Sequence, residues 1–374
     1  MMTTLELPAA PVAGELCPTG TGASPDDGRV RVHFTTDVEC SVGGAFADPA
    51  CRPWGYDLRF HGRFANQARE WGVGFIMDTL ERYGFGGTFF VEAFGGRYFG
   101  IEGLRHACGG IQDRGHDVQL HLHPVMLDLV AGAKRQVHRR SDDCGDYSLD
   151  EQVALLGEGL EILSDCGVTA PVAFRAGNFA ADANTWQAMR RVGLAVSSNL
   201  NLAFMNGVGR NGPCRLPVDG GSNDLFAVPG HGALMELPIT CIRALGANGR
   251  VGVRQLAIPA LSTWELIGAL KLARRQGIGR VTLILHSFDF AHLDDPAARI
   301  GRPIVTHVRR LTRLCQWLDR NRDAFEVSTV ADLAAQGLPL TNGQRSKSDP
   351  VPRTSLVLGC LRQLEQIKTR LVYR

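Results

Sequence analysis

The sequence predicts an α/β fold in which parallel strands alternate with crossover helices, arranged either as a barrel or as an open sheet. From residue 29 onward, short apolar runs alternate with longer segments of helical periodicity. Charged or polar residues directly follow several of the apolar runs, which is typical of a sheet whose strand ends carry a site. At 374 residues, the chain is long enough for one large barrel or for two smaller domains.

The predicted strands combine β-branched or aromatic residues with an alternating or continuous apolar pattern. We expect strands at 30–38, 87–93, 117–123, 171–175, 194–198, 281–286 and 325–328.

Helical segments lie between these strands. Ser148 with Glu151, and Ser262 with Glu265, have the spacing of capping boxes. Gly167 and Gly193 stand where helices are expected to end. We expect helices at 72–83, 149–165, 184–192, 263–275 and 304–320. The Gly- and Pro-rich stretches 40–65 and 199–258 are too long for simple connectors, so we expect functional loops there.

The two ends of the chain differ from its middle. We expect a flexible tail at 1–28 and a catalytic domain at 29–338. Residues 339–374 are expected to form a linker and a basic amphipathic helix. The apolar side of that helix is expected to carry Leu358, Leu361, Leu364, Ile367 and Leu371. Such a helix is expected to dock on its own domain or on a partner subunit, and contact with a membrane surface is the alternative.

Composition excludes several classes of function. The net charge is +2, from 40 basic and 38 acidic residues, and gives no general attraction to nucleic acid. No apolar run is long enough for a transmembrane segment, and no secretory signal peptide is evident. The ten Cys show no CxxC spacing and indicate reduced thiols in a cytoplasmic protein.

The most informative run is Gly115 to Pro124, which reads Gly-His-Asp-Val-Gln-Leu-His-Leu-His-Pro. Its alternating apolar residues indicate a strand, so His121 and His123 project to the same face. Two neutral imidazoles held this close form half of a metal site. The predicted strand 30–38 supplies the other half, because Asp37 and Glu39 also have i, i+2 spacing at its end. One of these carboxylates can bind a metal while the other acts as a base.

Two further strands end in functional residue types. Phe174-Arg175-Ala176-Gly177 ends one strand in an arginine, and Leu283-Ile284-Leu285-His286 ends another in a histidine. In order and spacing, these segments and the two above resemble the motifs of the polysaccharide deacetylase family, also called the NodB-homology or family 4 carbohydrate esterase family. The resemblance covers about residues 30–335. The second motif differs, because the family usually has His-x-x-x-His where this chain has His-x-His.

The resemblance implies a distorted (β/α)7 barrel and a role for each site residue. Asp37 would be the general base, Arg175 would hold it ionised, and His286 would be the general acid. Glu39, His121 and His123 would bind a divalent metal, most simply zinc. The roles of Asp37 and Glu39 are open to exchange. The substrate would be an acetylated sugar.

This chemistry matches the residue types. A metal with three protein ligands activates a bound water at neutral pH, and a neighbouring carboxylate accepts the proton of that water. The leaving amine must be protonated, which an acid on the opposite side can do. Candidates for substrate binding are Trp54 and Tyr56, in the loop after the carboxylates, and Asn178, in the turn after Arg175.

Three functions remain open at this stage. The first is removal of an N-acetyl group from a lipid-linked or nucleotide-linked sugar, in the cytoplasm or at the inner face of the membrane. The second is carbohydrate binding without catalysis, and the third is hydrolysis of a C–N bond in a small non-sugar amide. Retention of Asp37, Arg175 and His286 together argues against binding alone, which needs no base and acid.

Overall fold

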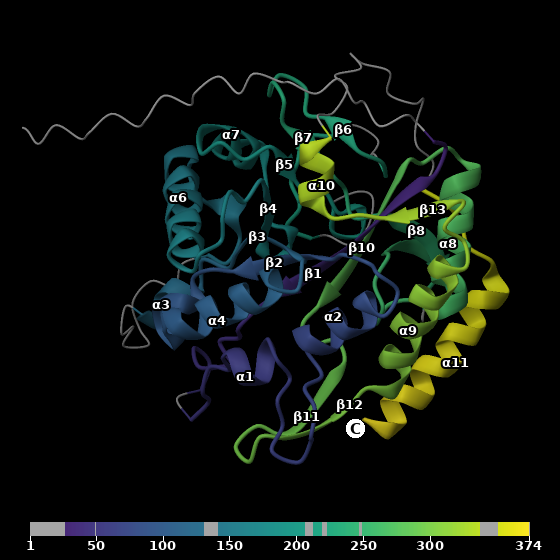
Figure 1. The fold of residues 1–374 in the computed structure, drawn as a ribbon, viewed down its shortest axis with the longest axis horizontal. Coiled ribbons are helices and arrows are strands. Elements are labelled where there is room, and N and C mark those ends of the chain that lie inside the picture. The colour runs from purple at the N-terminus through teal and green to yellow at the C-terminus, as the bar shows by residue number, and fades with distance from the viewer. Residues whose placement is uncertain are drawn as a thin grey trace, which may run out of the picture.

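A single curled sheet organises the chain (Figure 1). The computed structural model describes residues 27–48, 50–130, 141–205, 212–218, 223–246, 249–336 and 351–373. Along the sheet the strand order is β10-β1-β2-β3-β4-β5-β7-β6, and β13 also pairs with β1. The strands are β1 (Val30–Val38), β2 (Thr88–Glu92), β3 (Asp117–Leu122), β4 (Ala173–Ala176), β5 (Val196–Ser197), β6 (Phe226–Ala227), β7 (Met235–Glu236), β10 (Arg280–His286) and β13 (Phe325–Val327).

The sheet is parallel except where β6 pairs antiparallel with β7. It closes only part of a barrel, which agrees with the distorted barrel expected from the sequence. All seven predicted strands are present, with ends that differ by up to two residues.

Helices cover the outside of the sheet (Figure 1). They are α1 (Tyr56–Arg59), α2 (Val73–Glu81), α3 (Gly95–Phe99), α4 (Ile101–Gln112), α5 (Met126–Val130), α6 (Leu149–Asp165), α7 (Ala183–Arg191), α8 (Thr263–Arg275), α9 (Val305–Asp319), α10 (Val330–Ala335) and α11 (Leu356–Val372). Both predicted capping boxes form, at Ser148 and at Ser262. Gly167 and Gly193 follow α6 and α7 with φ of +82° and +85°, a conformation that favours glycine.

The two stretches predicted as long loops contain short elements. Residues 40–65 include α1, and residues 199–258 include β6, β7 and the hairpin of β8 (Cys241–Leu245) and β9 (Val251–Gln255). A second hairpin, β11 (Ala291–Asp295) with β12 (Ile300–Pro303), follows β10. These strands pair locally and were not expected from apolar periodicity.

Helix α10 closes the amino-terminal end of the sheet. Val330 and Leu333 pack against Phe90 and Ala173 from the inner face of the sheet. The backbone N–H of Val330 donates to Thr88 Oγ1 at 2.9 Å, at the start of β2. Apolar packing by α10 therefore covers this end of the sheet.

The tail predicted at 1–28 and the linker predicted at 339–352 fall almost entirely outside the described residues. The predicted C-terminal helix is present as α11 and packs beside α8 and α9 (Figure 1). Within the parts of the chain that the structure describes, no helix has the length and apolar character needed to cross a membrane.

Candidate active site

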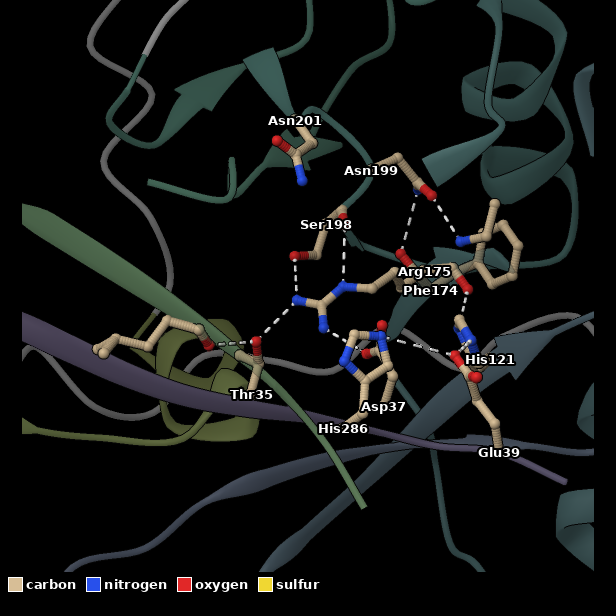
Figure 2. A network of polar contacts seen from close by, with 12 residues as sticks. Thr35, Asp37, Glu39, His121, Phe174, Arg175, Ser198, Asn199, Asn201 and His286 are labelled. Carbon is tan, nitrogen blue, oxygen red and sulfur yellow. Dashed lines mark hydrogen bonds and ion pairs between the residues drawn. The ribbon is translucent and has the colours of Figure 1, made fainter. Parts of the chain in front are cut away.

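Six residues predicted from the sequence meet at the carboxyl ends of neighbouring strands, and Figure 2 shows all of them except His123. Asp37 pairs in register with His286 across β1 and β10, and His121 pairs with Arg175 across β3 and β4. Glu39 and His123 follow the last residues of β1 and β3. The six side chains come from four strands. Because parallel strands have their carboxyl ends at the same edge of the sheet, these side chains face one common space.

Glu39, His121 and His123 form the centre of this cluster. The Oε1 atom of Glu39 lies 3.2 Å from His121 Nε2 and 3.4 Å from His123 Nε2. One donor atom from each of the three residues lies within 4.8 Å of the other two. These are the ligand types that zinc prefers, and together they leave a coordination position open for water or substrate.

Hydrogen bonds at the Nδ1 atoms of His121 and His123 determine the tautomer of each ring, and therefore which nitrogen can bind a metal. His121 Nδ1 lies 2.8 Å from the carbonyl oxygen of Arg175, and His123 Nδ1 lies 2.7 Å from Asp142 Oδ2. Each Nδ1 therefore carries the proton, and in a neutral ring each Nε2 lone pair is directed toward Glu39. Two lone pairs facing a carboxylate repel it unless a cation or a proton lies between them. His123 Nε2 is buried and makes no hydrogen bond among the described residues, so the three side chains fit a bound metal ion.

Electrostatics at the cluster favour positive charge at its centre. Burial acts to lower the pKa of His123, but Glu39 and Asp142 outweigh it and raise this pKa well above its usual value. Burial acts to raise the pKa of Glu39, but His123 and His121 outweigh it and hold this pKa well below its usual value. The carboxylate is therefore ionised, and a proton on His123 balances it. A bound divalent cation would take the place of that proton, because an imidazole binds metal only in its neutral form.

Asp37 is held by a fully buried arginine. Arg175 Nη1 donates to Asp37 Oδ1 at 2.5 Å, and Nη2 donates to Thr35 Oγ1 and Ser198 Oγ at 2.9 Å each. Its Nε donates to the carbonyl oxygen of Ser198 at 3.2 Å, and its guanidinium stacks 4.1 Å from the centre of the Phe90 ring. The arginine is thus fixed on every side, and it orients the carboxylate while balancing its charge.

His286, at the end of β10, is the third histidine beside Glu39. Its Nε2 is 4.0 Å from Glu39 Oε1, and its Nδ1 is 3.7 Å from Asp289 Oδ2. Asp289 also accepts the backbone N–H of His286 at 2.8 Å, which ties the carboxylate to the strand end. Burial acts to lower the pKa of His286, but Asp289, Glu39 and Asp37 outweigh it and raise this pKa to about 9. Asp289 is therefore placed to orient the imidazole of His286.

Two charged residues near the cluster had no signal in the sequence. Asp142 lies in the loop before α6, where it holds His123, and Asn178 Nδ2 donates to it at 3.0 Å. Arg59, at the end of α1, stacks 3.3 Å from the centre of the Phe288 ring and lies 3.9 Å from Glu39 Oε2. Asp142 lies in a loop and Arg59 in a helix of only four residues, so periodicity determines neither direction and only the folded chain reveals them.

Gly177 allows the histidine cluster to pack closely. A Cβ atom at this position would lie 2.5 Å from the His123 ring, which is too close for any side chain. The strand that carries Arg175, β4, must therefore be followed by a glycine.

The predicted substrate-binding residues have different surroundings. Asn178 is exposed beside Asp142 at the rim of the site. Tyr56 packs its ring against Phe60 and Phe99, and its hydroxyl donates to the carbonyl oxygen of Gly100 at 3.0 Å. Trp54 is half-buried and pairs through its backbone with Ser41, just after Glu39. Substrate contact by all three residues stays a prediction.

Comparison with known proteins supports the fold. No model of a known protein family and no curated protein sequence matches the chain. Among solved structures, a Mycobacterium smegmatis protein classed as a polysaccharide deacetylase aligns with a TM-score of 0.50 and 20% identity, over 88% of this chain and 94% of that protein. PuuE allantoinase aligns with a TM-score of 0.51 and 12% identity, over 89% of this chain and 97% of that enzyme. The predicted fold class is therefore confirmed.

Proposed function

On the fold that this chain shares with a polysaccharide deacetylase, we propose that it is a metal-dependent hydrolase that removes an N-acetyl group from an acetylated sugar. The observation that carries the proposal is the convergence of Glu39, His121 and His123 beside the Arg175–Asp37 ion pair. A three-residue donor set next to a fixed carboxylate is the arrangement that amide hydrolysis by an activated water requires.

Glu39, His121 and His123 hold the divalent ion, and their mixed oxygen and nitrogen donors favour zinc. When bound, the ion supplies a Lewis acid for the attacking water and for the carbonyl oxygen of the acetyl group. Asp142 fixes the orientation and tautomer of His123 through its Nδ1–H.

Asp37 removes the proton of the attacking water. Arg175 binds its Oδ1 atom, and donor atoms of Asp37, Glu39 and His286 lie within 4.8 Å of one another. The base is therefore within reach of a water beside Glu39. Because Arg175 is itself fixed by Thr35 and Ser198, the carboxylate is positioned before the substrate arrives.

His286 donates a proton to the nitrogen of the leaving amine. An amine is too basic to leave unprotonated, so a C–N bond needs an acid near the nitrogen. Asp289 orients the imidazole, since it is bound at the same strand end. Base and acid are thus register neighbours on β1 and β10, both beside Glu39.

A second candidate function is hydrolysis of a small cyclic amide rather than of an acetylated sugar. The likeness to PuuE allantoinase over nearly the whole of both chains supports it, because the same fold there carries a different C–N hydrolase. Carbohydrate binding without catalysis is the weaker alternative, since it leaves the Asp37–Arg175 pair and His286 without a purpose.

The test is hydrolysis by the purified full-length protein with zinc, and after removal of metal by a chelator. The panel contains lipid-linked and nucleotide-linked N-acetylated sugars, free N-acetylated sugars and allantoin. Acetate release from an N-acetylated sugar that stops on chelation and returns with zinc is expected. Turnover of allantoin alone would support the second candidate, and no turnover of any substrate by zinc-loaded protein would overturn both.

A further inference from the structure

Helix α11 exposes its apolar side and buries its polar side. Along one face, seven large apolar side chains are 49–67% exposed, and we call this face the apolar stripe. It consists of Leu356, Val357, Leu361, Leu364, Ile367, Leu371 and Val372. Leu358, which the sequence placed on this side, is instead half-buried, and its side chain reaches Gly268 of α8.

Polar contacts determine this orientation. Arg362 Nε lies 2.9 Å from Glu265 Oε2, with both side chains fully buried, and Arg362 also donates to the carbonyl oxygen of Leu245. Glu365 pairs with Arg310 of α9 at 2.6 Å. Rotating the helix to bury the stripe would break these ion pairs and leave buried charges uncompensated, which is strongly unfavourable. The stripe is therefore a stable surface feature of the folded chain.

A basic surface surrounds the stripe. Helices α8, α9 and α11 lie side by side along one edge of the molecule (Figure 1). Their exposed basic residues are Lys271, Arg274, Arg275, Arg309, Arg313, Lys368 and Arg370. Along these helices the acidic side chains are Glu265, Asp319 and Glu365, and each is paired with an arginine. The exposed charge of the three helices is thus positive, although the whole chain carries only +2.

An aromatic groove adjoins this surface. Trp264 is 64% exposed at the start of α8, next to the Glu265 that binds α11. Together with Trp317, Arg313 and Arg320 it lines a groove between α8 and α9. Exposed tryptophan beside arginine is typical of surfaces that meet the headgroup region of a bilayer.

We propose that α11 and the basic residues around it form a docking surface for an anionic lipid bilayer. An amphipathic helix with an apolar face and a basic rim lies in the plane of the membrane, with its leucines below the headgroups and its cations at the lipid phosphates. A second copy of the chain fits less well, because a symmetric interface would bring the same positive surfaces together. This proposal does not depend on the reaction proposed above.

The docking surface reaches the rim of the active site. At the end of α11, Tyr373 Oη donates to the carbonyl oxygen of Pro303, in the hairpin that follows β10. His307 of α9 bonds through Nδ1 to the carbonyl oxygen of Asp289 at 2.6 Å, three residues after His286. A bilayer bound at α11 would therefore lie close to the edge of the site.

The test is sedimentation of the full-length protein with vesicles of phosphatidylcholine alone and of phosphatidylcholine containing phosphatidylglycerol. Binding to the anionic vesicles that weakens with salt is expected. Changing Leu361, Leu364 and Ile367 together to Gln is expected to weaken it at least about 100-fold, since three exposed apolar side chains no longer enter the bilayer. Lys368→Gln with Arg370→Gln is expected to weaken it about 30-fold.

The control changes an exposed apolar residue elsewhere, Tyr98→Gln on α3, and is expected to bind as the wild type does. Thermal unfolding of each variant checks that the fold is kept. Absence of binding to anionic vesicles, or equal binding by wild type and the stripe variant, would overturn the proposal. So would a wild-type dimer that the stripe variant dissociates, because the stripe would then be covered by a second copy.

Discussion

Replacing Asp142 with Asn is expected to weaken metal binding about tenfold while the fold is kept. Asp142 is not a ligand, but its Oδ2 atom accepts His123 Nδ1–H at 2.7 Å. The same carboxylate accepts Asn178 Nδ2 at 3.0 Å and the backbone N–H of Val125 at 3.3 Å. Asn keeps the shape and the acceptor oxygen, so the change removes mainly the negative charge.

The size of the effect follows from this contact. A hydrogen bond to a charged group contributes about 1.5–3 kcal/mol, against about 0.5–1.5 kcal/mol for a neutral pair. The difference, about 1–1.5 kcal/mol, corresponds to a loss of about 5- to 10-fold in affinity. Carboxylates that orient a metal-binding histidine typically contribute 10- to 100-fold, and the Asp142 side chain is 29% exposed, which places it near the lower end of that range.

The assay is competition for zinc between the protein and a chromogenic chelator, for wild type, Asp142→Asn and the neighbouring Asp143→Asn. Asp143 is the matched control, because it carries the same charge in the same loop but does not bind His123. We expect the control to match the wild type within about twofold. Equal zinc affinity of wild type and Asp142→Asn would show that Asp142 does not orient His123 for metal binding.

Three further changes test other residues. Asp37→Asn is expected to keep the metal and lower kcat on the order of 10²- to 10⁴-fold, and a loss of only a few fold would place the base elsewhere. His286→Ala is expected to slow amide hydrolysis far more than hydrolysis of an activated acetyl ester, and equal losses would refute its role as the acid. Burial lowers the pKa of His33 to about 4, against about 6.5 when unfolded, so the unfolded chain binds more protons below pH 6.5 and stability falls as pH drops toward 4. Between pH 7.5 and 5, the free energy of unfolding measured with urea should therefore fall by about 2 kcal/mol more in the wild type than in His33→Gln. Equal decreases in the two proteins would contradict this prediction.

The sequence was sufficient to predict the centre of the site. His121 and His123 lie at the end of one strand and just after it, and Asp37 and Glu39 do so at another, so the i, i+2 rule alone placed each pair on one face. Parallel pairing then brought the strand ends together. Strand 30–38 was found at its exact limits because its apolar residues alternate along one face and every residue except Arg31 is buried.

The surrounding residues could not be predicted in this way. Asp142 reaches the site from a loop and Arg59 from the four-residue helix α1, and neither segment has a periodicity that relates sequence position to direction in space. Ser198, just after β5, carries no recognisable pattern in the sequence, yet it binds Arg175 by two atoms.

Helix α11 shows a different limit of sequence analysis. Its amphipathic pattern predicted the helix but suggested that the leucines would pack inward. The structure packs the polar side inward, because Arg362 and Glu365 find buried or half-buried partners on α8 and α9. An apolar stripe in a sequence identifies one face of a helix but does not say what that face contacts.

The most direct test of the account is the metal content of the purified protein, measured by elemental analysis after incubation with zinc and removal of the excess. We predict one zinc ion per chain in the wild type, because Glu39, His121 and His123 offer one set of three donors. We predict its loss in His121→Ala, whose Nε2 lies 3.2 Å from the carboxylate of Glu39. His116→Ala is the control and should keep its metal, since that histidine binds Glu81 and the backbone of Gly87 away from the cluster. Equal metal content in wild type and His121→Ala, or no metal in the wild type, would contradict the account.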